Sequence, residues 1–285
     1  MNIKNKFKKN YYITCYGRSL NDEGKPNYKT VPNRWLDMDE KWFELSNNRT
    51  INIFHDGKIT NNYIKNTEKI KYVYHDKYDC THEVGTFDIS EVDKLKKGKS
   101  YPSGFYTDKV ATETITYDEE GVDAEESRKY TNGDIITKGT FRIQYRRYQK
   151  DEGKILLAKM TELDYSKGNL KIKFEFHETL RHYANPILFA GFIGALADSS
   201  LGDIKSTGSS YGDASCYPST THVNGESIDT TYLSSTTDEQ KFINSLHKFG
   251  FGLHYIGTSM TYTHGTPDTY HNDHLHSGNF SPNYK

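Results

Sequence analysis

Three histidines lie within six positions near the end of the sequence, at 271, 274 and 276, and Asp273 lies among them. His274 and His276 are two residues apart, and side chains at i and i+2 of a strand point to the same face of a sheet. Both imidazoles could therefore reach one metal ion. An isolated pair of this kind is often an ordinary surface or core feature, so it needs further ligands before it defines a site.

A second polar cluster offers these ligands. His222 and Asp229 lie within the segment TTHVNGESID. Two histidines and one carboxylate, with a fourth position left for water, are the ligand set of a catalytic zinc site. Seven of the 12 histidines lie at or after residue 222, where basic residues are few. Neutral imidazoles combined with a carboxylate suit a divalent cation of the zinc type.

Both clusters resemble motifs of one group of zinc peptidases. The segment from Thr220 to Asp229 resembles the S-x-H-x-x-G-x-A-x-D motif of the D-Ala-D-Ala metallopeptidases, with Thr220 and Ser227 at the serine and alanine positions. The segment HNDHLH, which begins at His271, resembles the H-x-D-H-x-H signature of the penicillin-insensitive murein endopeptidases. The same group includes lysostaphin-type peptidases and the hedgehog signalling domain. The resemblance covers roughly residues 180–285.

The resemblance implies a zinc-dependent peptidoglycan endopeptidase that cleaves amide bonds in stem peptides or cross-links. His222, Asp229 and His276 would be the zinc ligands. Gly225 could permit a tight turn between two of them or be an ordinary loop glycine. These families often have an arginine upstream of the first motif that binds a substrate carboxylate, and residues 206–221 contain none. This difference favours an endopeptidase over a carboxypeptidase.

The resemblance also implies the residues that move protons. His274 would lie beside the metal and act as general base on the attacking water. Asp273 is the alternative base, because the D-Ala-D-Ala family keeps an acidic residue shortly before its last ligand. On a regular strand Asp273 would face away from His276, so we favour His274 and leave Asp273 open. His271 matches a further active-site histidine. Five other residues could line the cleft, although packing is the more ordinary role for each: Tyr211, Tyr217, His254, Tyr255 and His264.

Two other functions compete with the peptidase. A metal-dependent nuclease toxin uses similar histidine and carboxylate clusters, but the sequence near the motifs has few basic residues to bind phosphate. A zinc-binding module without activity, like the hedgehog domain, is the other alternative. The chain's net charge is −1, and no basic stripe indicates a nucleic-acid partner.

Composition predicts a folded chain without a membrane span. Hydrophobic residues make up 34% of the 285 residues, mean hydropathy is −0.84, and aromatics reach 14%, which is unlike a disordered chain. No 18-residue apolar run is present. Cys15, Cys80 and Cys216 are scattered, so we expect neither a disulfide framework nor a cysteine zinc site.

A protein that cuts the cell wall must first be exported from the cytoplasm. The N-terminus shows no apolar segment of a classical signal peptide, so we expect synthesis in the cytoplasm and export by another route. We favour an antibacterial effector of a specialised, type VI-like secretion system, acting in the periplasm or wall of a target cell. A cognate immunity protein and a secretion component would be its partners, with peptidoglycan as substrate. A phage-type lysis enzyme is the alternative.

The elements that must position the site lie in the last hundred residues. Apolar spacing predicts a buried helix that begins at Asn185-Pro186, and a capping box of Thr237 with Gln240 predicts a second helix. Strands are expected around residues 203–210, 226–233, 251–257 and 273–280. This order predicts an α+β fold over residues 176–285, a hedgehog or D-Ala-D-Ala-peptidase-like domain with a small antiparallel sheet and flanking helices.

The first 175 residues predict a separate β-rich domain. Short runs of alternating polarity, separated by Asp-Gly, Glu-Gly, Asn-Gly or Lys-Gly pairs, indicate strands. They lie at 11–17, 50–59, 70–75, 114–121, 139–149, 154–163 and 170–178. Residues 90–100 and 123–134 are expected to be solvated loops or a short helix. The role of this domain is open among delivery, loading and wall binding.

Overall fold

The computed structural model describes residues 49–62, 68–102, 106, 109–117, 124–139 and 145–282. The strand expected over residues 11–17 lies outside these ranges. Residues 46–285 form one compact unit. Its described residues contain 18 strands in three sheets, two α-helices and a short 3-10 helix.

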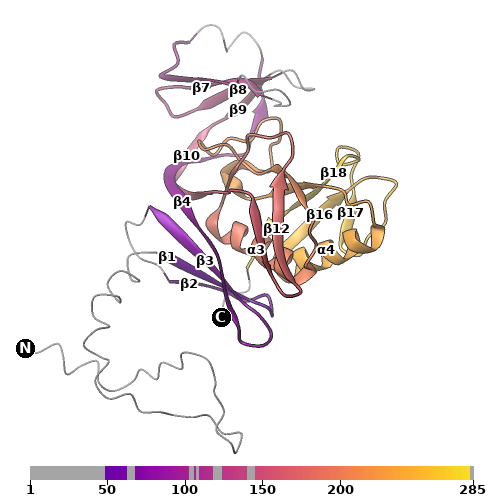
Figure 1. Ribbon diagram of the computed structural model, residues 1–285. Coiled ribbons are helices and arrows are strands. Elements are labelled where there is room, and N and C mark those ends of the chain that lie inside the picture. Colours follow the sequence, from indigo (N-terminus) through magenta and orange to yellow (C-terminus); the bar gives the residue numbers. More distant parts are fainter. Residues whose placement is uncertain are drawn as a thin grey trace, which may run out of the picture. The chain divides into compact units, whose positions relative to one another are not determined.

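The first sheet has six strands in the order β13-β10-β4-β3-β1-β2. Their bounds are β1 Arg49–Phe54, β2 Ile59–Asn62, β3 Lys69–His75, β4 Thr81–Leu95, β10 Lys150–Lys159 and β13 Tyr183–Ala184. β1 and β3 are parallel, and the other neighbours are antiparallel. β4 has 15 residues, pairs first with β3 and then with β10, and continues toward the five-stranded sheet (Figure 1).

The second sheet has five antiparallel strands in the order β5-β9-β8-β7-β6. Their bounds are β5 Lys99–Ser100, β6 Glu113–Thr116, β7 Ala124–Lys129, β8 Ile135–Gly139 and β9 Tyr145–Tyr148. Because β5 follows β4 and β10 follows β9, this sheet is an insertion between two paired strands of the first sheet.

The third sheet has seven strands in the order β11-β12-β14-β15-β18-β16-β17. Their bounds are β11 Leu163–Lys167, β12 Leu170–Phe176, β14 Lys205–Gly208, β15 Ile228–Thr231, β16 Phe251–Ile256, β17 Gly265–Pro267 and β18 His274–Phe280. The sheet is mixed, because β12 is parallel to β14 and β16 is parallel to β17. It carries the clusters that the sequence analysis singled out.

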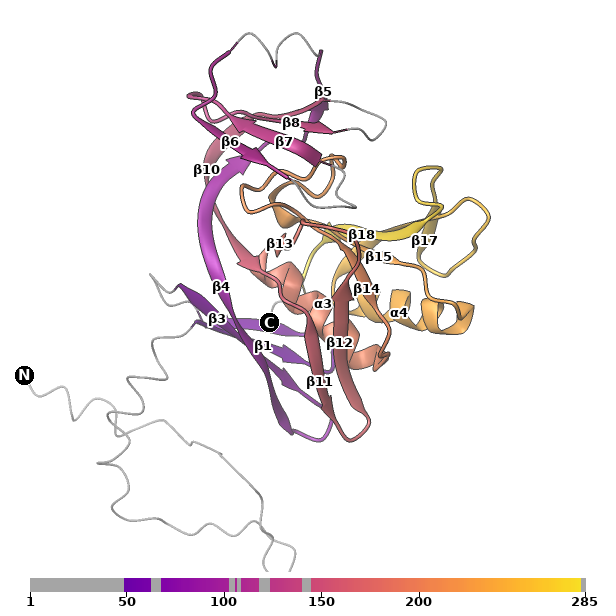
Figure 2. The same cartoon turned by 45° about the horizontal axis from the view of Figure 1, so that its top comes forward.

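Helix α3 (Pro186–Ser199) lies at the centre of the core. The predicted start is confirmed: the Asn185 side chain accepts hydrogen bonds from the amides of Ile187 and Leu188, and Pro186 occupies the first turn. Twelve of its 14 residues are buried, because the first sheet packs on one side and the third sheet on the other (Figure 2). No helix of the described residues is long and apolar enough to cross a membrane.

Helix α4 (Thr236–Lys248) packs against α3. Its N-cap is Ser235, whose hydroxyl accepts a hydrogen bond from the amide of Asp238 at 3.2 Å. The predicted capping box of Thr237 with Gln240 is therefore wrong, because the helix is capped two residues earlier. The Gln240 side chain instead bonds the backbone of Thr263.

The predicted fold class is wrong. The described residues are mostly β-structure in three sheets with only two α-helices, not an α+β hedgehog or D-Ala-D-Ala-peptidase-like domain with a small antiparallel sheet and flanking helices. Two physical reasons explain the error. All of β11, and all of β12 except its last residue, precede residue 176. Both strands nevertheless belong to the same sheet as the motifs. The charged segments 90–100 and 123–134 were expected to be loops, but the first contains the end of β4 and the second contains β7. Half-exposed strands carry charges at alternate positions, so such segments resemble loops.

A single hydrophobic core crosses residue 175, where the sequence changes in texture. The rings of Tyr72 and Phe87 each lie 5.2 Å from the ring of Phe189 on α3, and the Phe174 ring lies 5.3 Å from that of Phe192. The Tyr72 hydroxyl donates to the carbonyl of Pro186 at 3.0 Å. Residue 175 itself lies within β12. The N-terminal strands therefore help to hold the helix that precedes the polar clusters.

Glu239 makes folding stability depend on pH. The side chain is fully buried in α4, one carboxylate oxygen accepts from the Leu233 amide at 2.7 Å, and the other has no hydrogen-bond partner among the described residues. Burial raises the pKa of Glu239 from 4.5 to about 7. The folded state therefore binds this proton more tightly than the unfolded state, so stability falls as pH rises from about 4.5 through 7.

We expect Glu239→Gln to remove this pH dependence and to raise the free energy of unfolding at pH 8 by about 3 kcal/mol. Denaturant unfolding between pH 5 and 8 would measure it. The control is Glu152→Gln, an exposed glutamate of β10. Equal pH slopes for wild type and Glu239→Gln would contradict the prediction.

Candidate metal centre

His222 lies in a loop that orients one ring nitrogen. It precedes the 3-10 helix η2 (Val223–Gly225), and its side chain is buried. Its Nδ1 lies 3.1 Å from the carbonyl oxygen of Ser227. A carbonyl only accepts, so Nδ1 carries the proton and Nε2 presents a lone pair. A backbone carbonyl commonly fixes a metal-binding imidazole in this way.

Asp229 and His276 face each other across two antiparallel strands. The register of β15 and β18 places them directly opposite. Asp229 Oδ1 lies 2.9 Å from His276 Nδ1 and 3.0 Å from His222 Nε2, and the two nitrogens are 2.9 Å apart. Ligand atoms at 2.0–2.1 Å from a tetrahedral zinc ion are separated by about 3.3 Å. The predicted convergence is confirmed: this buried group could hold a metal ion.

The charges at this group match the forms that bind metal. Burial lowers the pKa of His222 to about 4, although Asp229 opposes the shift, so the imidazole is neutral. Burial alone would raise the pKa of Asp229, but its contacts with His222, His274 and His276 hold that pKa well below its usual value. A neutral imidazole and an ionised carboxylate are the ligand forms of such residues.

Arg181 lies beside the metal ligands. Its guanidinium is 3.8 Å from Asp229 Oδ2 and donates to the carbonyl of Thr207 at 2.7 Å. Arg181 lies outside residues 206–221, where the resemblance to the peptidases places an arginine. Arg181 lies in the segment before β13, and only the fold brings it to β15. It is buried, so its charge acts on Asp229 from inside the protein.

His274 and Asp273 form a pair at the edge of the group. His274 begins β18 and lies on the same face as His276, as the spacing predicts. Its Nδ1 lies 2.7 Å from Asp273 Oδ1, and its Nε2 lies 3.7 Å from Asp229 Oδ2. Asp273 precedes the strand and its side chain is 81% exposed. It therefore reaches the group only through His274.

His271 packs against the same histidines. Its ring is stacked on Tyr255 at 5.0 Å and lies 4.9 Å from the His274 ring and 5.4 Å from the His276 ring. Asp268 Oδ1 lies 2.7 Å from His271 Nδ1. Burial lowers the pKa of His271. The structure thus brings together all six residues that the motifs singled out.

A groove of about 900 Å³ opens at His276. Tyr255 lines it, whereas Tyr211, Tyr217 and His254 are buried and His264 stacks on His247. The sequence analysis expected few basic residues here, but β4 and the residues after it contribute Lys94, Lys96 and Lys97. The other lining residues are Leu95, Asp151, Asn185, Ile187, Leu188, Thr220, Thr221, Val223, Asn224, Glu226, Ser227, Leu253, Asn279, Phe280 and Pro282.

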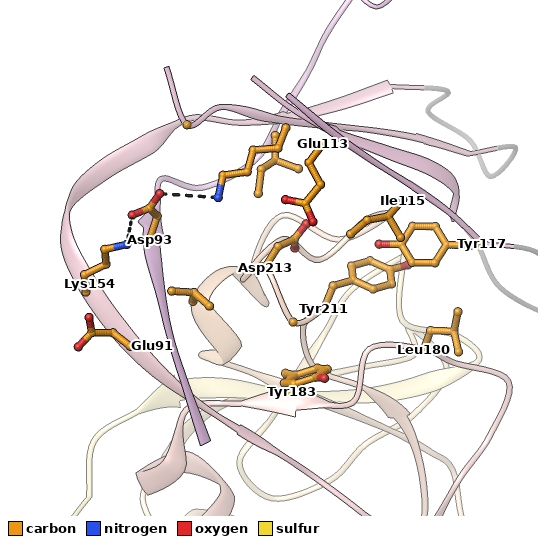
Figure 3. Close-up of a pocket in the computed structure, with 15 residues that line it drawn as sticks. Glu91, Asp93, Glu113, Ile115, Tyr117, Lys154, Leu180, Tyr183, Tyr211 and Asp213 are labelled. Carbon is orange, nitrogen blue, oxygen red and sulfur yellow. Dashed lines mark ion pairs between the residues drawn. The ribbon is translucent and has the colours of Figure 1, made fainter. Parts of the chain in front are cut away.

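A second cavity, of about 480 Å³, contains none of the metal ligands. It lies where strands of the five-stranded sheet meet β4 and the loop after β14 (Figure 3). Tyr117, Tyr183 and Tyr211 surround one part of it, and Asp93 forms an ion pair with Lys154 at 2.6 Å in another part. Of these two cavities, only the groove is lined by one of the three metal ligands, His276.

Comparison with known proteins adds no assignment. No family model, no curated protein and no solved structure matches the chain.

Gly225 is required by the turn between two metal ligands. Its φ is +66°, and a Cβ there would lie 2.5 Å from the amide nitrogen of Asn185. The amide of Asn185 also donates to the Gly225 carbonyl at 3.0 Å. The loop that carries His222 is thus pressed against the start of α3.

We expect Gly225→Ala to destabilise the fold by about 2–4 kcal/mol, because strain at positive φ adds to a backbone clash. Gly168→Ala is the matched control: its φ is +60°, and nothing lies within 4 Å of a Cβ there. The control should cost only about 1 kcal/mol. Denaturant unfolding measures both, and equal losses would show that the clash is absent.

Proposed function

We propose that this protein is a zinc-dependent peptidoglycan endopeptidase that cleaves amide bonds of stem peptides or cross-links. The observation that carries the proposal is the convergence of His222 Nε2, Asp229 Oδ1 and His276 Nδ1 within 3.0 Å of one another in a buried group. These residues occupy the ligand positions of the two peptidase motifs.

The donor set favours zinc. Two imidazole nitrogens and one carboxylate oxygen suit zinc better than magnesium or calcium, which take oxygen ligands. A zinc ion bound there would supply Lewis acidity, which polarises the scissile carbonyl and lowers the pKa of a water molecule.

His274 is proposed as the general base. Asp273 accepts a hydrogen bond from His274 Nδ1, so His274 Nε2 keeps a lone pair for a proton and faces the ligand group. Asp273 orients the ring and stabilises the charge that His274 gains. His271 stacks on Tyr255 and supports the His274 and His276 rings from the side.

An endopeptidase fits the groove better than a carboxypeptidase. Arg181, whose guanidinium lies 3.8 Å from Asp229 Oδ2, is buried and bonded to the Thr207 carbonyl. It is absent from the groove lining. A terminal carboxylate in the groove would therefore find no guanidinium, which favours an internal peptide bond as the substrate.

We expect His274→Ala to keep one zinc ion per chain but to lower muropeptide release from purified sacculi by 10²–10⁴-fold. Asp229→Asn should lose both zinc and activity, because it removes the anionic ligand. Metal analysis and mass spectrometry of released muropeptides measure these outcomes. Full activity of His274→Ala would refute its role, and sacculi left intact by the zinc-loaded wild type would refute the function.

A metal-dependent nuclease is the second candidate, because Lys94, Lys96 and Lys97 line the groove with His276. Phosphate binding uses such residues. The same zinc-loaded preparation should leave plasmid DNA intact. Plasmid cleavage with intact sacculi would favour the nuclease.

For delivery, we propose an antibacterial effector exported by a specialised secretion system, with a phage-type lysis enzyme as the alternative. An enzyme that cuts the cell wall is harmless in the cytoplasm, where its substrate is absent. Expression in a bacterium should therefore be toxic only when an export signal is added, and His274→Ala should abolish that toxicity. Growth curves measure the effect, and toxicity without the export signal would contradict the proposal.

A further inference from the structure

The end of β4 is fastened to the loop that carries His222. The amide of Leu95 donates to Asn224 Oδ1, and Asn224 Nδ2 donates to the carbonyl of Leu95, both at 2.9 Å. Both residues are buried. Asn224 adopts a positive φ of 65° within the 3-10 helix that follows His222. The last residue of β4 therefore has a fixed position relative to the metal ligands.

The residues after Leu95 are held by two further contacts. The amide of Lys96 donates to the carbonyl of Gln149 at 2.8 Å. A Cβ at Gly98 would lie 2.5 Å from the Tyr148 ring, so the chain passes directly over that ring. The Tyr148 hydroxyl in turn donates to the carbonyl of Ser219 at 2.8 Å. Lys96 and Lys97 are thus carried by backbone that is anchored on both sides.

These two lysines place positive charge at one wall of the groove. Lys94 forms an ion pair with Asp151 at 3.3 Å. Lys96 and Lys97 are exposed, and neither forms an ion pair within the described ranges. Glu226 lines the same groove and is the only unpaired acidic residue there among those described. The exposed ammonium groups are therefore available to an anionic ligand.

We infer that Lys96 and Lys97 bind carboxylates of the substrate, so that the groove selects an acidic peptide. The same contacts fix the position of the peptide relative to the metal centre. This inference rests on the proposed peptidase function and names its substrate class. An acidic peptide fits better than a nucleic acid, because three lysines and no arginine line the groove and one of the lysines is paired with Asp151, whereas a polynucleotide requires a longer basic surface. The N-terminal strands would then contribute directly to substrate recognition.

The test compares two stem-type peptides that differ at one residue, glutamate in one and glutamine in the other, as substrates of the zinc-loaded full chain. We expect the wild type to have a KM about tenfold lower for the glutamate peptide, from two exposed ion pairs. The double variant Lys96→Gln, Lys97→Gln should lose this preference, with kcat for the glutamine peptide unchanged. Added salt should weaken the preference of the wild type.

The matched control is Lys159→Gln with Lys167→Gln, which removes two exposed charges outside the groove. It should keep the preference. The inference is overturned if the wild type has equal KM values for the two peptides, or if the preference survives in the groove variant. Cleavage of both peptides would still leave the proposed function intact. If neither peptide is cut, calorimetric binding of both still tests the lysines, and plasmid binding that depends on the same lysines would also overturn the inference.

Discussion

The antiparallel pairing of β15 with β18 is the constraint on which the metal centre depends. It sets Asp229 opposite His276 and, two residues along the same face, brings His274 within reach of the same carboxylate. A slip of one residue would turn Asp229 to the opposite face of the sheet. β18 also pairs with β16 on its other side, so the register is fixed from both edges. An ionised carboxylate this deeply buried requires the partners that this register supplies.

The local parts of the site could be predicted from the sequence. Alternation along a strand placed His274 and His276 on one face, and the spacing of His222 from Asp229 fits a loop that returns into a strand. The polar and apolar pattern also predicted where α3 begins. Each of these depends on neighbours within a few residues, where spacing alone determines direction.

The remaining parts depend on contacts between distant segments. Arg181 reaches the metal centre and Lys96 reaches the groove only because β13 and β4 belong to a sheet that packs on the same helix, and no local pattern marks either residue. The fold class was mistaken for a related reason: charged segments that resemble loops become strands when their partners cover one face. The question about Asp273 had a different origin. Side chains alternate only within a strand, and β18 begins at His274, so the bend before it lets Asp273 reach the His274 ring.

The contact between Leu95 and Asn224 joins residues 129 positions apart. His222 and His276, by comparison, are 54 positions apart. Closing the longer loop costs more chain entropy, so we expect this contact to form after the metal ligands have met. A partly folded chain could therefore gather its metal ligands before it has a complete groove. Assembly of the metal ligands and completion of the groove are then separate events. The protein would bind its substrate only when the whole chain has reached its final topology.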